Sequence, residues 1–143
     1  MTTDAVLGIK VGDKATFSKE VSQEDIVTFA QVTGDMNRLH LDESYAQKTR
    51  FKQRVAHGML AAGYISAALG TKLAGPDVTV VYLNQSLRFL RPIFIGDTVT
   101  ATVEVKAIDG ERRFVTVQTD CHNQKGEQVV TGEATVLLDA YRG

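Results

Sequence analysis

The stretch GMLAAGYISAALGTKL, residues 58–73, constrains the fold of this chain more than any other feature. It contains no charged side chain before Lys72 and is rich in alanine and glycine. A helix that is apolar on all sides is normally buried, and this one falls short of the roughly 20 residues that cross a bilayer. The sequence therefore predicts a helix that the rest of the protein surrounds.

The second half of the chain has the pattern of strands. The segments VTVVYLNQSLRFL, TVTATVEVKAI, RFVTVQTDCHN and QVVTGEATVLLDA contain period-two stretches of Val, Thr or Ile, and a further strand is expected around residues 14–21. Asp109-Gly110 and residues 123–126 are typical of hairpin turns. Together these patterns predict an α+β fold, in which a curled antiparallel β-sheet of about five strands wraps around a long central helix.

We expect residues 1–143 to form a single domain, because the chain has no proline-rich linker, low-complexity segment or internal repeat. The last strand of such a sheet would leave one edge unpaired. A second copy of the chain is the simplest cover for that edge, so the sequence favours a homodimer.

Composition and charge exclude several classes of function. The formal net charge is -1, so no general attraction to nucleic acid is expected. No apolar run reaches the roughly 18 residues of a membrane span, and the N-terminus lacks the pattern of a secretory signal. The single cysteine, Cys121, cannot form an internal disulfide, which is typical of a reducing compartment. We expect a cytoplasmic protein in which Cys121 is a packed strand residue.

Short helices are expected in the first half of the chain. Ser22 has the position of an N-cap, with Asp25 three residues later as in a capping box. Gly34 ends the helical pattern that follows, and residues 42–48 form a further helical turn. The residues between these two helices, 35–40, are expected to lie in a loop.

That loop carries Asp35, Asn37 and His40 within six residues. A carboxylate and an imidazole that hold one water molecule have complementary roles, since one can take a proton from the water while the other gives one to a carbon atom. Taken singly, Asp35 reads as a turn aspartate, Asn37 as a turn residue and His40 as a hydrogen-bonded loop histidine. Their joint occurrence favours hydration chemistry.

Gly58, at the start of the apolar helix, is a second candidate. The first N–H groups of a helix have no intrahelical partner, and together with the helix dipole they can stabilise a carbonyl oxygen that gains negative charge. The alternative is that Gly58 is only a flexible helix start and that His57 is a cap or core residue. Ser66 lies two turns further along, where its hydroxyl either faces the site or bonds back to the preceding turn.

These motifs together resemble the MaoC-like, (R)-specific enoyl-CoA hydratase family (hydratase 2) of hot-dog-fold proteins. The resemblance runs over FAQVTGDMNRLHLDESYA, RVAHGML and LNQSLRFLRPIFIGDTV, and the element order agrees along nearly the whole chain. The family pattern reads Gly-Asp-x-Asn-Pro-Leu-His, with a small residue six positions later. Arg38 replaces the usual proline, and the matching residues are Asp35, Asn37, Leu39, His40 and Ala46.

The resemblance implies that Asp35 and His40 are the catalytic pair and that Gly58 holds the thioester carbonyl. It also implies Ser66 as an active-site hydroxyl, and Asn37 as the residue that holds the loop or the water. The implied reaction is the reversible syn addition of water to a trans-2-enoyl-CoA, which gives an (R)-3-hydroxyacyl-CoA. Asp35 would activate water for attack at C3, and His40 would deliver a proton to C2.

No cofactor and no metal are expected, and coenzyme A would be the carrier part of an acyl-CoA thioester substrate. The histidines at positions 40, 57 and 122 show no ligand spacing, and the chain has no cysteine pair. Substrate contacts are expected from His57 and from Arg88 and Arg91, because guanidinium groups suit the phosphates of coenzyme A. The alternatives are that these arginines are solvated charges, or that the basic residues of 48–54 serve the phosphates instead.

Three alternative functions fit the same fold. Acyl-CoA thioesterases and dehydratases that act on acyl-carrier protein typically use an acidic residue on or near the central helix, and residues 58–73 contain none. A non-catalytic acyl-thioester-binding module would not need both Asp35 and His40. The sequence does not decide whether the pathway is fatty-acid metabolism or the supply of polyhydroxyalkanoate precursors. The preferred acyl-chain length depends on the depth of the pocket, which Ile65, Leu69 and Val130 could set, and the sequence does not rank these residues.

Overall fold

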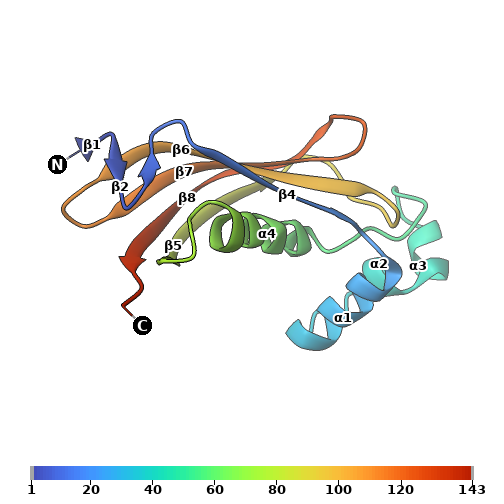
Figure 1. The fold of residues 1–143 in the computed structure, drawn as a ribbon. Helices are drawn as coiled ribbons and strands as arrows, with labels where there is room; N and C mark the ends of the chain where they lie inside the picture. Colours follow the sequence, from blue (N-terminus) through green and yellow to red (C-terminus); the bar gives the residue numbers. More distant parts are fainter. Residues whose placement is uncertain (1, 143) are drawn as a thin grey trace.

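The computed structural model describes residues 2–142 as a curved sheet packed against one helix (Figure 1). The sheet is antiparallel, and β1 (Thr2–Thr3) pairs with one end of β6, while β2 (Ala5–Val6) and β3 (Ile9–Lys10) form a small separate hairpin. Its long strands follow the spatial order β4 (Lys14–Glu20), β6 (Thr98–Asp109), β7 (Phe114–His122), β8 (Gln128–Ala140) and β5 (Val78–Phe89). The predicted α+β architecture with about five principal strands is confirmed.

Period-two patterning explains why the central strands form. In β6, Val99, Ala101, Val103 and Val105 are fully buried while the intervening threonines and Glu104 are only half-buried. Each buried valine contributes about 1.5–3 kcal/mol relative to an exposed one. The one-sided pattern also fixes the register, because a slip of one residue would turn every valine to the opposite face.

The apolar helix is shorter and less completely buried than its sequence suggested. Helix α4 (Gly58–Ala67) is followed by a π-helical segment, η1 (Ala68–Lys72), in which the N–H of Leu73 donates to the carbonyl of Ala68 at 3.1 Å. One face of α4 and η1 is buried under the sheet, and the opposite face is exposed at positions 59, 63, 66 and 70. A single copy of the chain therefore covers only one side of this helix.

The caps of α1 (Gln23–Thr33) are those that the sequence predicted. The Ser22 hydroxyl accepts from the Asp25 N–H, and the Asp25 carboxylate accepts from the Ser22 N–H, each at 3.1 Å. Gly34 takes a left-handed conformation with φ of 83°, and its N–H donates to the Ala30 carbonyl at 2.8 Å. Glycine adopts this conformation without steric cost, so the helix stops where the residue occurs.

The prediction that residues 35–40 form only a loop is wrong in part. Residues from Arg38 onward form a short helix, α2 (Arg38–Leu41), followed by α3 (Glu43–Gln47), which confirms the predicted helical turn. Asn37 is the N-cap of α2, because its side-chain oxygen accepts from the Leu39 N–H at 3.0 Å. His40 is therefore presented by a helix rather than by a free loop.

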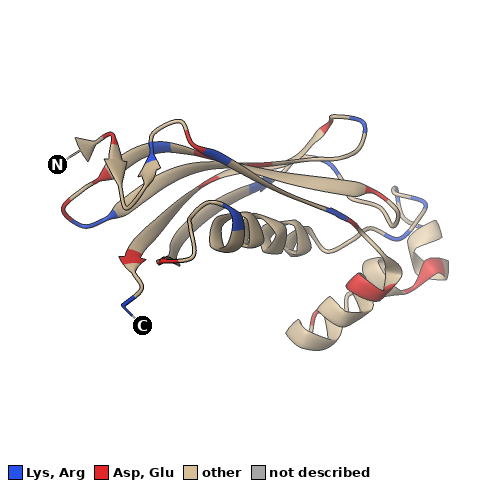
Figure 2. Cartoon of the chain, viewed as in Figure 1, with Lys and Arg blue, Asp and Glu red and all other residues tan. Residues whose placement is uncertain are grey.

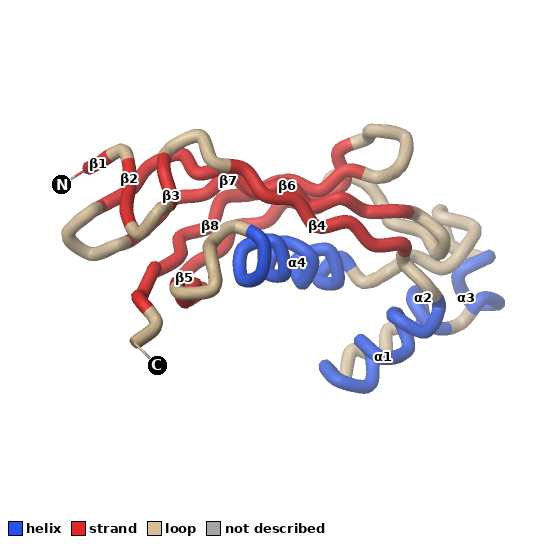
Figure 3. The backbone as a smooth tube through the Cα atoms, viewed as in Figure 1, coloured by secondary structure: helices blue, strands red, loops and turns tan. Residues whose placement is uncertain are grey.

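The helices α1 to α3 gather beside the N-terminal end of α4, and the sheet lies over α4 as a second layer (Figure 3). Charged residues of both signs lie mostly in turns, near strand ends and on the outer helices, while α4 carries none (Figure 2). Cys121 is buried in β7, as expected, and burial raises the pKa of its thiol to about 12. Within residues 2–142, no helix combines the length and the hydropathy needed to span a bilayer.

Candidate active site

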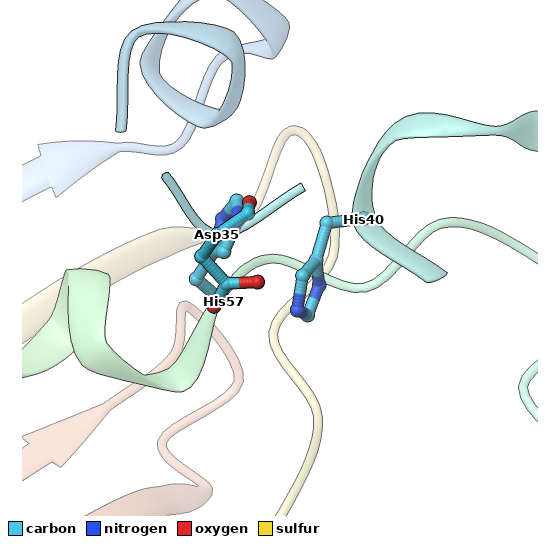
Figure 4. A group of neighbouring side chains, drawn as sticks. All are labelled: Asp35, His40 and His57. Carbon is cyan, nitrogen blue, oxygen red and sulfur yellow. The ribbon is translucent and has the colours of Figure 1, made fainter. Parts of the chain in front are cut away.

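Asp35, His40 and His57 meet where the end of α1, the helix α2 and the start of α4 converge (Figure 4). Ligating atoms of the three side chains all lie within 4.8 Å of one another. The structure thus brings together the carboxylate and the imidazole that the sequence paired. It also adds a second imidazole, whose position the spacing of the histidines did not reveal.

Local hydrogen bonds shape the loop that carries Asp35. The Asp35 N–H donates to the Thr33 hydroxyl at 3.1 Å, and one carboxylate oxygen of Asp35 accepts from the Asn37 N–H at 3.3 Å. The side-chain oxygen of Asn37 itself accepts the hydrogen bond that caps α2. These bonds are consistent with Asn37 holding the loop, one of the two roles that the sequence left open for it.

His40 is held at both its ring and its backbone. Its Nδ1 lies 2.5 Å from the carbonyl oxygen of Val55, and its own carbonyl accepts from Nε of Arg54 at 2.7 Å. A carbonyl only accepts, so Nδ1 carries a hydrogen and Nε2 is left as the reactive nitrogen. Arg54 also donates to the Gln23 side chain at 2.8 Å, which ties α2 to α1 and leaves this guanidinium engaged.

The segment that leads to His57 is anchored on both sides. The Val55 N–H donates to the Leu39 carbonyl at 3.3 Å, and the Ala56 N–H donates to the Ile93 carbonyl at 2.7 Å. His57 follows as the N-cap residue of α4, although its side chain makes no capping bond. Its Nε2 instead lies 3.0 Å from the carbonyl oxygen of Asp35.

A cavity of about 500 Å³ opens beside His40 at the start of α4. Gly58 borders it, and a Cβ atom at this position would lie 2.7 Å from two ring carbons of Phe89. The remaining lining is largely apolar and consists of Phe51, Val55, Ala56, Met59, Phe89, Leu90, Arg91, Pro92, Ile93 and Val130. The site therefore places His40, with Asp35 next to it, beside a mostly apolar hollow at an open helix N-terminus.

Of the three residues expected to contact substrate, only Arg91 lines the cavity. Arg91 lines the cavity, where it donates to the Gln128 carbonyl at 3.3 Å and lies 3.7 Å from the Glu127 carboxylate. Arg88 is exposed, and strand alternation turns its side chain to the face opposite Phe89. Neither Asp35 nor His57 lines the cavity, but Asp35 is exposed whereas His57 is buried, so the structure does not support the expectation that His57 contacts substrate.

Ser66 does not line the cavity that opens beside His40 of its own chain. It is on the exposed face of α4 and lines a separate small pocket of about 70 Å³, together with Leu69 and Val80. The same geometry explains why sequence spacing was ambiguous here. A position two turns from Gly58 shares its helix face but lies too far along the axis to reach the same group of side chains.

The donor set of Asp35 and the two histidines is a poor match to a metal site. His40 Nδ1 and His57 Nε2 already point at carbonyl oxygens. The two rings are in contact, with centroids 4.0 Å apart and planes inclined by 35°, which leaves one ring nitrogen of each histidine as a possible ligand. Proton transfer suits the arrangement better than metal binding does.

The family model described as "MaoC like domain" matches residues 8–131. The chain belongs to the MaoC-like family. The family resemblance drawn from the motifs is thereby confirmed. The matched segment contains every residue of the site described above, from the end of α1 to the strand β8.

Individual relatives of this MaoC-like chain agree with that assignment. An "(R)-specific enoyl-CoA hydratase" of Rhodospirillum rubrum is 52% identical over 132 residues, which cover 92% of this chain and 90% of the relative. A "3-hydroxybutyryl-CoA dehydratase" of Methylorubrum extorquens is 44% identical over 130 residues, covering 91% and 81%. The solved (R)-hydratase of A. caviae, described as involved in PHA biosynthesis, has a TM-score of 0.88 at 41% identity, covering 94% and 100%. The predicted hot-dog fold is confirmed.

Proposed function

We propose that this protein is a hydro-lyase, an (R)-specific enoyl-CoA hydratase that adds water reversibly to trans-2-enoyl-CoA. The observation that carries the proposal is the placing of the Asp35 carboxylate and the His40 imidazole within 4.8 Å, beside an apolar cavity that begins at Gly58. The names of the two similar proteins support it, because hydration and dehydration are the two directions of one reaction.

In the proposed reaction, one water molecule is held between Asp35 and His40. Asp35 takes a proton from the water as its oxygen attacks C3 of the enoyl group. His40 in its doubly protonated form keeps Nδ1–H on the Val55 carbonyl and delivers the Nε2 proton to C2. The product gains OH at C3 and H at C2 on the same face, and the proton held by Asp35 then returns to His40.

The negative charge that develops on the thioester oxygen needs a donor, and the first N–H groups of α4 are available for this. The Gly58 N–H lies at the positive end of the helix dipole and borders the cavity. Loss of a single donor of this kind lowers kcat about 10²–10³-fold in enzymes where it has been removed. The absence of a side chain at Gly58 lets the carbonyl approach the backbone closely.

The apolar lining of the cavity is suited to the acyl part of the substrate, and Arg91 provides a cation at its edge for a phosphate of coenzyme A. Coenzyme A enters the proposal as part of the substrate, and the proposed chemistry uses no cofactor or metal. Because acyl-CoA thioesters are intracellular metabolites, we assign the protein to the cytoplasm. Its (R)-3-hydroxyacyl-CoA product is chemically suited to polyhydroxyalkanoate synthesis.

We also propose that the protein acts as a homodimer. The edge strand β5 has no partner on its outer side among the described strands, and its residues Val81, Tyr82 and Leu83 are exposed. A second hollow of about 580 Å³ lies between this strand and the exposed face of α4. A second copy would cover both features, and Ser66 would then face the partner rather than Asp35 of its own chain.

The test is to follow the loss of enoyl-CoA absorbance with crotonyl-CoA and longer trans-2-enoyl-CoA substrates, and to determine the configuration of the product. We expect turnover and the (R) product. The control is the double variant Asp35→Asn, His40→Gln, which should still bind the thioester but not hydrate it. An (S) product, or equal turnover by the double variant, would contradict the proposal.

A further inference from the structure

His57 is a buried polar side chain for which the proposed reaction has no use. Its exposed fraction is 1%, and within residues 2–142 it shares full burial of a polar side chain only with Thr119. It lies outside the lining of the cavity and, unlike the exposed Asp35, has almost no surface that a substrate could reach. Burying a polar ring carries a desolvation cost, and its hydrogen bonds and neighbours indicate what offsets that cost here.

The hydrogen bond of His57 fixes its protonation state. Its Nε2 lies 3.0 Å from the backbone carbonyl of Asp35, and a carbonyl can only accept, so Nε2 must carry the hydrogen. The other nitrogen, Nδ1, is buried and has no hydrogen-bond partner in the structure. A hydrogen on Nδ1 would therefore be a buried donor without an acceptor, which is strongly unfavourable.

The burial of His57 favours the same neutral state. Burial lowers the pKa of His57, and the charge of nearby His40 lowers it further, while the hydrogen bond to Asp35 and the Asp35 carboxylate act in the opposite direction. Asp35 and His40 are the titratable groups that act on it, and its remaining ring neighbour, Phe29 of α1, is apolar. The neutral ring with Nε2–H is the form that this surrounding stabilises.

The His57 ring also contacts two other rings. One contact is with His40, whose centroid is 4.0 Å away at an interplanar angle of 35°, and another is with Phe29 at 4.7 Å. His40 is thus held by a hydrogen bond from its Nδ1 to Val55 and by contact with the ring of His57. The same His57 ring contacts the backbone of Asp35 and the ring of His40.

We propose that His57 is a positioning residue, which as a permanently neutral imidazole sets the Asp35 backbone and the His40 ring in the relative geometry needed to share one water. This inference rests on the proposed hydratase function. A neutral ring in contact with His40 adds no repulsion when His40 becomes doubly protonated, whereas a second cation at this distance would disfavour the proton donor. Small displacements of reacting groups are enough to matter, since about 1 Å can cost about 10²-fold in rate.

The first test reads the protonation state directly and does not depend on turnover. In protein labelled with ¹⁵N-histidine, the His57 signals, assigned by their loss in His57→Gln, should show Nε2–H and unprotonated Nδ1 from pH 5 to pH 8. A His57 signal that titrates in this range, or that shows the hydrogen on Nδ1, would overturn the inference. This readout remains decisive even if the wild type does not hydrate enoyl-CoA, which would instead refute the proposed function.

The second test separates a positioning role from a merely structural one. Gln can place an amide nitrogen where His57 has Nε2, Asn reaches only the place of Nδ1, and Leu fills the space without a donor. We expect kcat to fall about 10²-fold in His57→Leu and His57→Asn with little change in KM, and to return to within about 10-fold of wild type in His57→Gln.

Each other outcome of the second test counts against the inference. Equal kcat in all variants would mean that the donor has no role, and a rise in KM at unchanged kcat would indicate a substrate contact. Equal losses in folded His57→Gln and His57→Leu would mean that volume rather than the hydrogen bond matters. If His57→Leu does not fold, the comparison of His57→Gln with His57→Asn and the ¹⁵N signals decide the question.

Discussion

Gly58 is the residue whose lack of a side chain has the clearest structural consequence. The ring of Phe89 packs directly over its Cα, and a Cβ there would approach two ring carbons to 2.7 Å, closer than normal contacts allow. Phe89 is 53% exposed, so its ring can move aside. A methyl group at this position would therefore have two separable effects: it would displace the Phe89 ring, and it would hinder the approach of a substrate carbonyl.

We predict that Gly58→Ala lowers kcat/KM by about 10²-fold, because the methyl group occupies the approach to the helix N–H groups that hold the carbonyl. Adding Phe89→Leu should relieve the contact and restore the midpoint of thermal unfolding, but not the turnover. Steady-state kinetics and thermal unfolding of the single and double variants check this. Recovery of kcat/KM in the double variant would mean that the Phe89 contact alone explains the loss.

At the scale of the helix or strand, the sequence predicted well those features that depend on neighbouring residues in the chain. The limits of α1 follow from Ser22 and Gly34, whose effects reach only a few residues along the chain. The strands follow from period-two burial, which needs only a face to pack against. Helix α2 was missed because its four residues depend on the Asn37 cap and on Arg54, a contact 14 residues away.

In the candidate site, too, the sequence revealed the residues that are close together in the chain and missed the contacts between distant ones. Asp35, Asn37 and His40 were found because they lie in one short motif. The Val55 carbonyl, the ring of Phe89 and the role of His57 were not found, because the contacts that define them join residues 15 to 31 positions apart. The string RVAHG was the available signal for His57; it left open a cap or core residue but did not show which groups the ring contacts.

The edge strand β5 gives a prediction at this scale. Leu83 is 46% exposed in a single chain, so an arginine there would cost the monomer little, whereas a dimer that covers β5 would bury its charge. We expect the wild type to be dimeric by light scattering and Leu83→Arg to be shifted to monomer. Val11→Arg is the matched control, because Val11 is similarly exposed but lies next to the opposite edge of the sheet.

Unchanged mass of Leu83→Arg in the same measurement would show that β5 is not the contact between copies. A shift in both variants would point instead to a general effect of added charge.

At the scale of the whole molecule, the sheet and α4 serve as a rigid frame for a site built by less regular segments. The sheet buries one face of α4 and thereby fixes where its N-terminus points, and α1 to α3 bring Asp35 and His40 to that end (Figure 3). The polar pair, the helix dipole and the apolar cavity meet at one place. Each alone is common in proteins, and their meeting gives the chain its proposed chemistry.

The most direct test of whether Asp35 and His40 act on one water molecule is to measure kcat for Asp35→Asn, for His40→Gln and for the two changes combined. Groups that act on one water form a unit, so removal of the second should cost little once the first is gone. We expect each single change to lower kcat by about 10²–10⁴-fold, and the double variant to lie within about 10-fold of the weaker single variant. Losses that multiply in the double variant, or wild-type kcat in either single variant, would contradict the claim that Asp35 and His40 share one water.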